Sequence, residues 1–113
     1  MITEVTSNEL SDFLSSSKRV LLVEFFTRES TGSYLIELSL TEAQNEFSNA
    51  LEVYKVNIEK NAQLAEKYKL FSFPSLVFFR DGKMIDILTG AIPKKLLLNK
   101  IGEVLKQKDK TII

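Results

Sequence analysis

The chain has 113 residues, of which 44% are apolar and 27% charged, and its 15 basic residues are balanced by 15 acidic ones. This length fits one domain with a sizeable core, and the neutral balance argues against a surface dedicated to nucleic acid or to anionic membranes. There is no cysteine and no histidine, which excludes disulfides, thiolate nucleophiles, cysteine zinc sites and His-based triads, so we expect no metal and no cofactor.

The beginning of the chain predicts a short strand followed by a short helix. Residues 1–5 form a brief apolar stretch that is typical of an edge strand. Thr6 and Glu9 have the spacing of a capping box, in which each side chain accepts a hydrogen bond from the backbone N–H of the other. We expect a helix to follow and to end within the serine run at residues 15–17.

A buried strand and a long helix are predicted next. Val20–Phe26 is a continuous apolar run with β-branched and aromatic residues, which indicates a central strand covered on both faces. Residues 27–33 are polar and predict a loop. The following apolar stripe predicts an amphipathic helix over residues 34–49, with core-facing positions at Leu35, Ile36, Leu38, Leu40, Ala43 and Phe47.

The second half predicts three more strands and two helices. Residues 51–58 alternate as a buried strand, and residues 61–68 form a short helix with Asn61 as its cap. Ser75–Arg80 and Lys83–Thr89 are two strands of a hairpin, because Asp-Gly between them suits a type I′ turn. Pro93 begins the last helix, whose apolar face is predicted at Leu96, Leu97, Ile101, Val104 and Leu105.

The predicted order is β-α-β-α-β-α-β-β-α. Strands that alternate with helices, followed by a hairpin and one more helix, predict an α/β fold with a mixed central sheet and helices on both faces. We expect a single domain over residues 1–113, with a charged tail that frays from about residue 107.

Five short segments, in the same order as in the thioredoxin family, resemble that family's sequences. They are VLLVEFF at residues 20–26, YKVNIE at 54–59, FPSL at 73–76, FFRDGK at 78–83 and TGA at 89–91. The resemblance covers nearly the whole chain and implies the thioredoxin fold. It also implies that Pro74 corresponds to the family's cis-proline.

The chain departs from the family at the redox motif. Where thioredoxins carry W-C-G-P-C-K, residues 29–34 read ESTGSY, so Ser30 and Ser33 occupy the two cysteine positions. A serine hydroxyl has a far higher pKa than a thiol and forms no stable bond to sulfur, so thiol–disulfide exchange is not expected. Ser30 is instead suited to cap the helix that follows.

Glu24 and Lys55 resemble the family's acid and its accompanying lysine. The resemblance implies a relic of the pair that moves a proton during thiol–disulfide exchange. The alternative is a buried ion pair that only satisfies both groups, which we favour because there is no thiol to serve.

The resemblance also implies a peptide-binding surface. In the family, the backbone before the cis-proline pairs with an extended peptide. We expect the corresponding surface to consist of Phe71, Phe73, Pro74, Ser75, Gly90 and Tyr34, with core packing as the alternative for Phe73.

The favoured function is therefore a redox-inactive, non-enzymatic thioredoxin-like domain that binds a protein or an extended peptide. The alternatives are a structural subunit of a larger assembly and a thiol–disulfide oxidoreductase whose two redox cysteines have been replaced by serine. A glutathione-linked enzyme is disfavoured because the chain has no room for an added helical domain.

Partners and location are predicted from the same features. We expect a protein or peptide partner, no nucleic acid, no membrane, and a monomer or weak homodimer. The chain starts without a basic segment and an apolar segment of signal-peptide type, and has no apolar run of about 20 residues, so we expect a cytoplasmic location.

Overall fold

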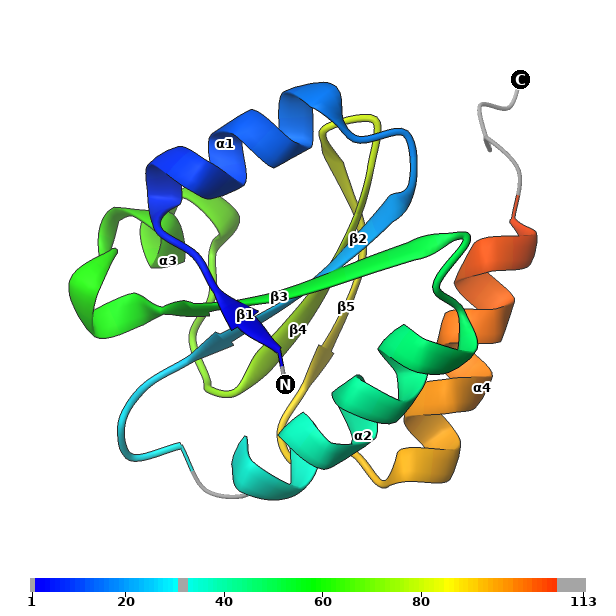
Figure 1. Ribbon diagram of the computed structural model, residues 1–113. Helices are drawn as coiled ribbons and strands as arrows, with labels where there is room; N and C mark the ends of the chain where they lie inside the picture. Colours follow the sequence, from blue (N-terminus) through cyan, green and yellow to red (C-terminus); the bar gives the residue numbers. More distant parts are fainter. Residues whose placement is uncertain (1, 31–32, 108–113) are drawn as a thin grey trace.

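A computed structural model describes residues 2–30 and 33–107 and contains a five-stranded sheet in the order β1-β3-β2-β4-β5 (Figure 1). In chain order the elements are β1 Thr3–Glu4, α1 Ser7–Ser16, β2 Val20–Phe26, α2 Ser33–Glu46, β3 Leu51–Asn57, the 3₁₀ helix η1 Ile58–Lys60, α3 Gln63–Tyr68, β4 Ser75–Arg80, β5 Lys83–Thr89 and α4 Lys94–Lys106. The predicted α/β fold and its element order are confirmed.

The sheet is mixed, and β2 lies at its centre. β3 runs parallel to both β1 and β2, whereas β4 is antiparallel to β2 and to β5. The register places Lys55 of β3 beside Glu24 of β2, with Leu76 of β4 on the other side of Glu24. Because side chains in register share a face of the sheet, Glu24 and Lys55 lie on the same side.

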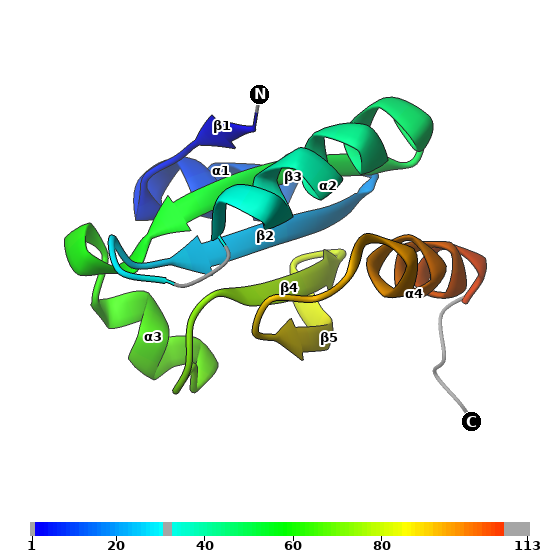
Figure 2. The same cartoon turned by 90° about the horizontal axis from the view of Figure 1, so that it is seen from below.

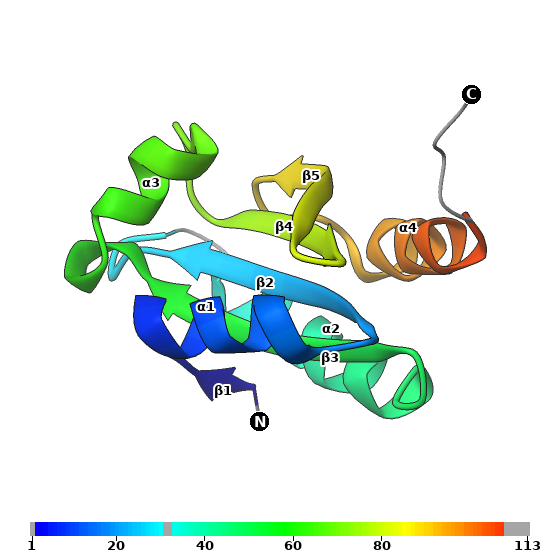
Figure 3. The same ribbon diagram turned by 90° about the horizontal axis from the view of Figure 1, so that it is seen from above.

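Two separate apolar clusters cover the two faces of this sheet. Leu22 and Phe78 pack with α2 and α4 on one face, and Val23 and Phe25 pack with α1 and α3 on the other. Figures 2 and 3 show these helix pairs on opposite sides of the strands. The continuous apolar run of β2 is explained by this arrangement, because alternate residues enter different clusters.

Two predicted local motifs are confirmed. The Thr6 hydroxyl accepts from the Glu9 N–H at 3.2 Å, and the Glu9 carboxylate accepts from the Thr6 N–H at 2.9 Å, so the capping box starts α1. At the hairpin, Asp81 and Gly82 have φ of 53° and 78°. Both values are positive, as a type I′ turn requires.

Asn61 does not cap α3, which corrects the prediction. The N-cap of α3 is Ala62, which makes no side-chain capping bond. The Asn61 side chain accepts from the Ser7 N–H at 3.0 Å and donates to the Asn57 carbonyl at 2.9 Å. This residue therefore ties the start of α1 to the end of β3, and a residue in such a bridge is not available to cap a helix.

The predicted helix over residues 34–49 ends earlier, at Glu46. The Arg19 guanidinium donates to the carbonyl of Ser48 at 2.9 Å, and the Leu51 N–H donates to the carbonyl of Phe47 at 2.9 Å. These two bonds stabilise the turn that leads into β3 instead of a further helical turn. Three positions assigned to core-facing stripes are largely exposed: Leu35 at 64%, Leu38 at 56% and Leu96 at 59%. The tail that was expected to fray lies almost wholly outside the described residues.

Candidate functional site

Three segments that are far apart in the sequence meet at the end of the sheet where β2 stops. They are the loop that follows β2, the segment between α3 and β4, and the connection from β5 to α4 (Figures 1 and 2). This end carries most of the residues that the sequence analysis assigned to a site. The loop after β2 lies here because β2 and β3 are parallel: the chain leaves the sheet at this end and returns along α2 to the other end, where β3 begins.

Ser30 forms a compact turn with Thr27. Its hydroxyl accepts from the Thr27 N–H at 2.8 Å and lies 3.1 Å from the Thr27 hydroxyl, while the Ser30 N–H donates to the Thr27 carbonyl at 3.0 Å. The hydroxyl is therefore engaged in the loop itself. The side chain of Ser33 and residues 31–32, on which the predicted capping of α2 depends, lie outside the part of the chain that the structure describes.

The Phe73–Pro74 peptide bond is cis. The carbonyl of Pro74 accepts from the N–H of Gly90 at 2.9 Å, and the buried hydroxyl of Ser75 donates to the carbonyl of Ser72 at 2.5 Å. Gly90 has a φ of 89°, a conformation that favours glycine. Pro74, Ser75 and Gly90 are thus brought together, with their backbone fixed by these bonds.

Large apolar side chains are exposed both in the segment before the cis bond and at the start of α2. Phe71, before the cis bond, is 90% exposed, and Tyr34, in the first turn of α2, is 75% exposed. Leu35 and Leu38 continue the exposed face along α2, since residues one, three and four apart fall within about 100° of the helix circumference. We call Tyr34, Leu35, Leu38 and Phe71 the apolar surface. Phe73 differs: it is half-buried and packs against the α1–α3 cluster, as its alternative assignment predicted.

Below α2, charged side chains are placed in or near the core. Glu24 is 1% exposed. Lys55, beside it in the register, has its Nζ 2.5 Å from Oε1 of Glu37 and 5.8 Å from the centre of the Phe26 ring. Sequence analysis missed Glu37, because only the packing of α2 on β3 brings it to Lys55.

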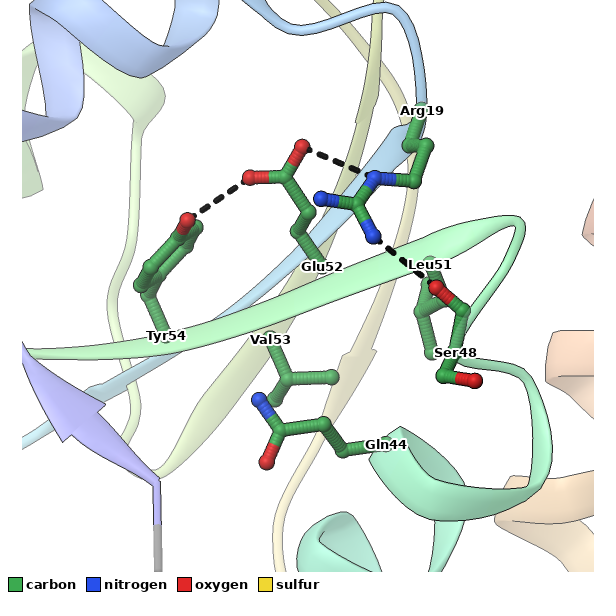
Figure 4. A pocket seen from close by; sticks show the side chains of 7 residues that line it. All are labelled: Arg19, Gln44, Ser48, Leu51, Glu52, Val53 and Tyr54. Atoms are coloured by element: carbon green, nitrogen blue, oxygen red, sulfur yellow. Dashed lines mark hydrogen bonds and ion pairs between the residues drawn. The ribbon is translucent and has the colours of Figure 1, made fainter.

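A second polar cluster lies at the opposite end of β2 (Figure 4). Glu52 accepts hydrogen bonds from the hydroxyl of Ser17, from the Tyr54 hydroxyl at 2.7 Å and from the Arg19 Nε at 3.2 Å. Burial raises the pKa of Glu52, but the hydrogen bonds from Ser17 and Tyr54 and the charge of Arg19 outweigh it, so the net pKa is lowered. Burial, followed by the bond to Glu52, raises the pKa of Tyr54 to about 12.

This second cluster borders a hollow of about 270 Å³. Both Glu52 oxygens and two Arg19 nitrogens already form hydrogen bonds within the protein, so these groups do not need a ligand. The bonds connect the segment before β2, the segment after α2 and β3. Among the described residues, no group of three or more acidic side chains is placed to hold a metal ion. No described helix combines the length and apolar character needed to span a bilayer.

The architecture is that of a thioredoxin-like α/β domain, with a mixed sheet between helices and a cis-proline directly before β4. The Thioredoxin family model matches residues 1–103, and the chain therefore belongs to the thioredoxin family.

Relatives that carry the thioredoxin name align over most of this chain. "Thioredoxin" of Griffithsia pacifica is 30% identical over 105 residues, which cover 93% of this chain and 96% of the relative. "Thioredoxin 1" of Synechococcus elongatus is 31% identical over 104 residues, or 92% and 94% of the two chains. "Thioredoxin Y2, chloroplastic" of Arabidopsis thaliana is 31% identical over 91% of this chain, which spans 62% of that longer relative.

Proposed function

We propose that this chain is a redox-inactive thioredoxin-family domain that binds a protein or an extended peptide at the surface beside Pro74. The observation that carries the proposal is the exposure of large apolar side chains at this end of the sheet: Phe71, three residues before Pro74, is 90% exposed, and Tyr34, at the start of α2, is 75% exposed. Exposed aromatic side chains that gather at one end of a domain are typical of protein contact sites.

The chemistry argues against redox activity of this chain. Disulfide exchange needs a thiolate that attacks sulfur and a second thiol that resolves the mixed disulfide. The chain has no cysteine, and Ser30 directs its hydroxyl to Thr27. The absence of histidine also leaves no imidazole to activate a serine.

The kind of partner follows from the charges around the apolar surface. On α2, Glu37 is paired with Lys55, and Glu42 lies 2.7 Å from Lys94 of α4. Both carboxylates are neutralised within the chain, so they offer little net charge to a ligand. Exposed Arg28 and Glu29 in the loop after β2 are opposite in sign, and Lys69 is an exposed cation two residues before Phe71. The surface therefore suits a segment with aromatic or aliphatic side chains that is not basic.

Binding is tested by selecting peptides from a random library displayed on phage and titrating them into isotope-labelled protein. The expected result is that selected peptides are apolar, shift the amide signals of Tyr34, Leu38 and Phe71, and bind at least about tenfold more weakly to Phe71→Ser and Tyr34→Ser. Leu96→Ser on α4 is the matched control, because it removes an exposed leucine elsewhere. Shifts confined to other regions, or equal loss with Leu96→Ser, would contradict the proposal.

The alternative, an oxidoreductase with both cysteines replaced by serine, has one supporting observation: both dithiol positions carry the isosteric residue. An insulin-reduction assay on the chain and on the double variant Ser30→Cys/Ser33→Cys separates the two. We expect no turnover from the chain as it stands, and turnover from the double variant only if the surroundings of the two positions still support exchange. Turnover by the unmodified chain would refute the redox-inactive assignment.

A further inference from the structure

The strand β5 forms one edge of the sheet, so one side of its backbone is not paired with any described strand. The register shows which groups point outward. The Gly90 N–H donates to the Pro74 carbonyl, so the pairs two residues apart from it, Leu76 with Leu88 and then Phe78 with Asp86, are the hydrogen-bonded ones. Ile87 lies between them in a non-hydrogen-bonded pair, and its N–H therefore points to the open edge.

The side chain of Asp86 covers that outward N–H. Its Oδ1 accepts from the N–H of Ile87 at 2.8 Å, and its Oδ2 lies 2.8 Å from the Nζ of Lys100 on α4. Lys100 also approaches Glu103, at 3.4 Å. The carboxylate thus bonds to the edge with one oxygen and is anchored to a helix with the other.

The same part of the edge is also irregular. Phe78 pairs with Asp86, but Phe79 pairs with Met84, so Ile85 is an extra residue on β5. Such a bulge bends the strand and interrupts the regular series of outward groups that another strand would need. The bulge and the Asp86 carboxylate are adjacent, so the middle of β5 is closed by two features at once.

We propose that Asp86 closes the β5 edge against strand addition by a second copy of this chain. A second copy is the partner against which the edge must be closed. Two identical β5 edges can pair antiparallel about a two-fold axis, so that each strand contacts the same residues of the other copy. Asp86 prevents this by occupying the Ile87 N–H that such a pair would use. Lys100 is a positioning residue that orients the carboxylate. The proposal is independent of the peptide-binding function and concerns a different part of the molecule.

Three variants test the closure. Asp86→Ala removes the carboxylate, Asp86→Asn keeps an oxygen that can accept from Ile87 but loses the ion pair, and Lys100→Ala removes only the anchor. In dilute protein, we expect the Ile87 amide of Asp86→Ala to exchange with solvent about tenfold faster or more. In sedimentation velocity, the average mass of Asp86→Ala should rise with concentration above that of the unmodified chain. Asp86→Asn and Lys100→Ala keep the acceptor oxygen but lose its anchor, so both should show smaller changes than Asp86→Ala in both measurements.

The site of association is tested with a spin label, since the chain has no cysteine to compete for it. In Asp86→Ala, a nitroxide on Thr89→Cys should show coupling between copies, and one on Ser11→Cys of α1 should not. Unchanged Ile87 exchange and mass in Asp86→Ala would overturn the proposal. Association of Asp86→Asn as strong as that of Asp86→Ala would also overturn it, because the effect would then be due to the lost charge. Coupling between copies at Ser11→Cys rather than at Thr89→Cys would overturn it as well. A urea titration of each variant shows whether faster exchange reflects local opening or global unfolding.

Discussion

Lys55 lies beside Glu24 in the β2–β3 register, and its ammonium is 2.5 Å from the carboxylate of Glu37 on α2. Lys55 therefore neighbours the buried Glu24, which is 1% exposed, and forms an ion pair with the partly buried Glu37. The ion pair ties α2 to β3 at the residue that neighbours Glu24 in the sheet. It favours the interpretation of Lys55 as a structural partner, because its ammonium is committed to the helix.

Loss of Lys55 should therefore destabilise the fold more than loss of an exposed lysine. We expect Lys55→Met to lower the free energy of unfolding by about 1 to 3 kcal/mol, since a partly buried carboxylate loses its partner. Lys94→Met is the matched control, because Lys94 also pairs with a glutamate of α2 but is 55% exposed, and it should cost about 0.5 kcal/mol or less. Urea unfolding measures both, and equal costs would contradict the structural role.

Acid should weaken the protein through Glu52. The pKa of Glu52 in the folded protein lies below its ordinary value of 4.5. Its ionised form therefore stabilises the fold above pH 4.5, and this stabilisation is lost as the pH falls through the folded pKa. Glu52→Gln should be less stable at neutral pH and should show a flatter stability profile below pH 4.5. The exposed Glu46→Gln serves as control, and a profile of Glu52→Gln that parallels the unmodified chain would argue against this assignment.

Alkali should act through Tyr54. The pKa of Tyr54 in the folded protein is raised from 10.0 to about 12. The neutral phenol therefore stabilises the fold fully below pH 10, and this stabilisation is lost as the pH rises through the folded pKa. We expect phenolate absorbance to show one delayed titration step that is missing in Tyr54→Phe and retained in Tyr34→Phe. If the delayed step persists in Tyr54→Phe, another tyrosine is responsible for it.

Two glycines should respond in opposite directions to alanine. Gly82 has a φ of 78°, and a Cβ there would lie 3.3 Å from the Leu14 carbonyl, so Gly82→Ala should cost about 1 kcal/mol or more. Gly102 lies within α4, and a Cβ there meets nothing within 4 Å, so Gly102→Ala should stabilise by about 0.5 to 1 kcal/mol. Thermal unfolding compares the two, and a stabilising Gly82→Ala would show that the turn can relax.

The strands and turns were predictable because their signals are local. The bounds of β2, β4 and β5 follow from apolar runs that end at polar or glycine positions, and the Asp81-Gly82 turn follows from the φ that those residues tolerate. The Thr6–Glu9 box is likewise complete within four residues. In each case the deciding interaction connects neighbours in the chain.

The errors occur where a distant segment decides. Asn61 has the residue type of a cap, but Ser7, 54 positions away, donates to its side chain. In α2, the stripe Ile36, Leu40 and Ala43 faces the sheet, whereas Leu35 and Leu38 lie off it. Apolar composition alone did not separate these two sets. For the same reason, the contacts of Lys55 with Glu37 and of Asp86 with Lys100 carried no signal in the sequence.

The division of the core by the sheet has an evolutionary consequence. Only the inner stripe of α2 enters the cluster on its side, and none of the α2 side chains that the structure describes belongs to the cluster on the α1–α3 side. Substitutions on the outer face of this helix can therefore accumulate with little effect on the packed interior. The outer face of α2 can thus vary between relatives while the rest of the domain keeps its sequence constraints.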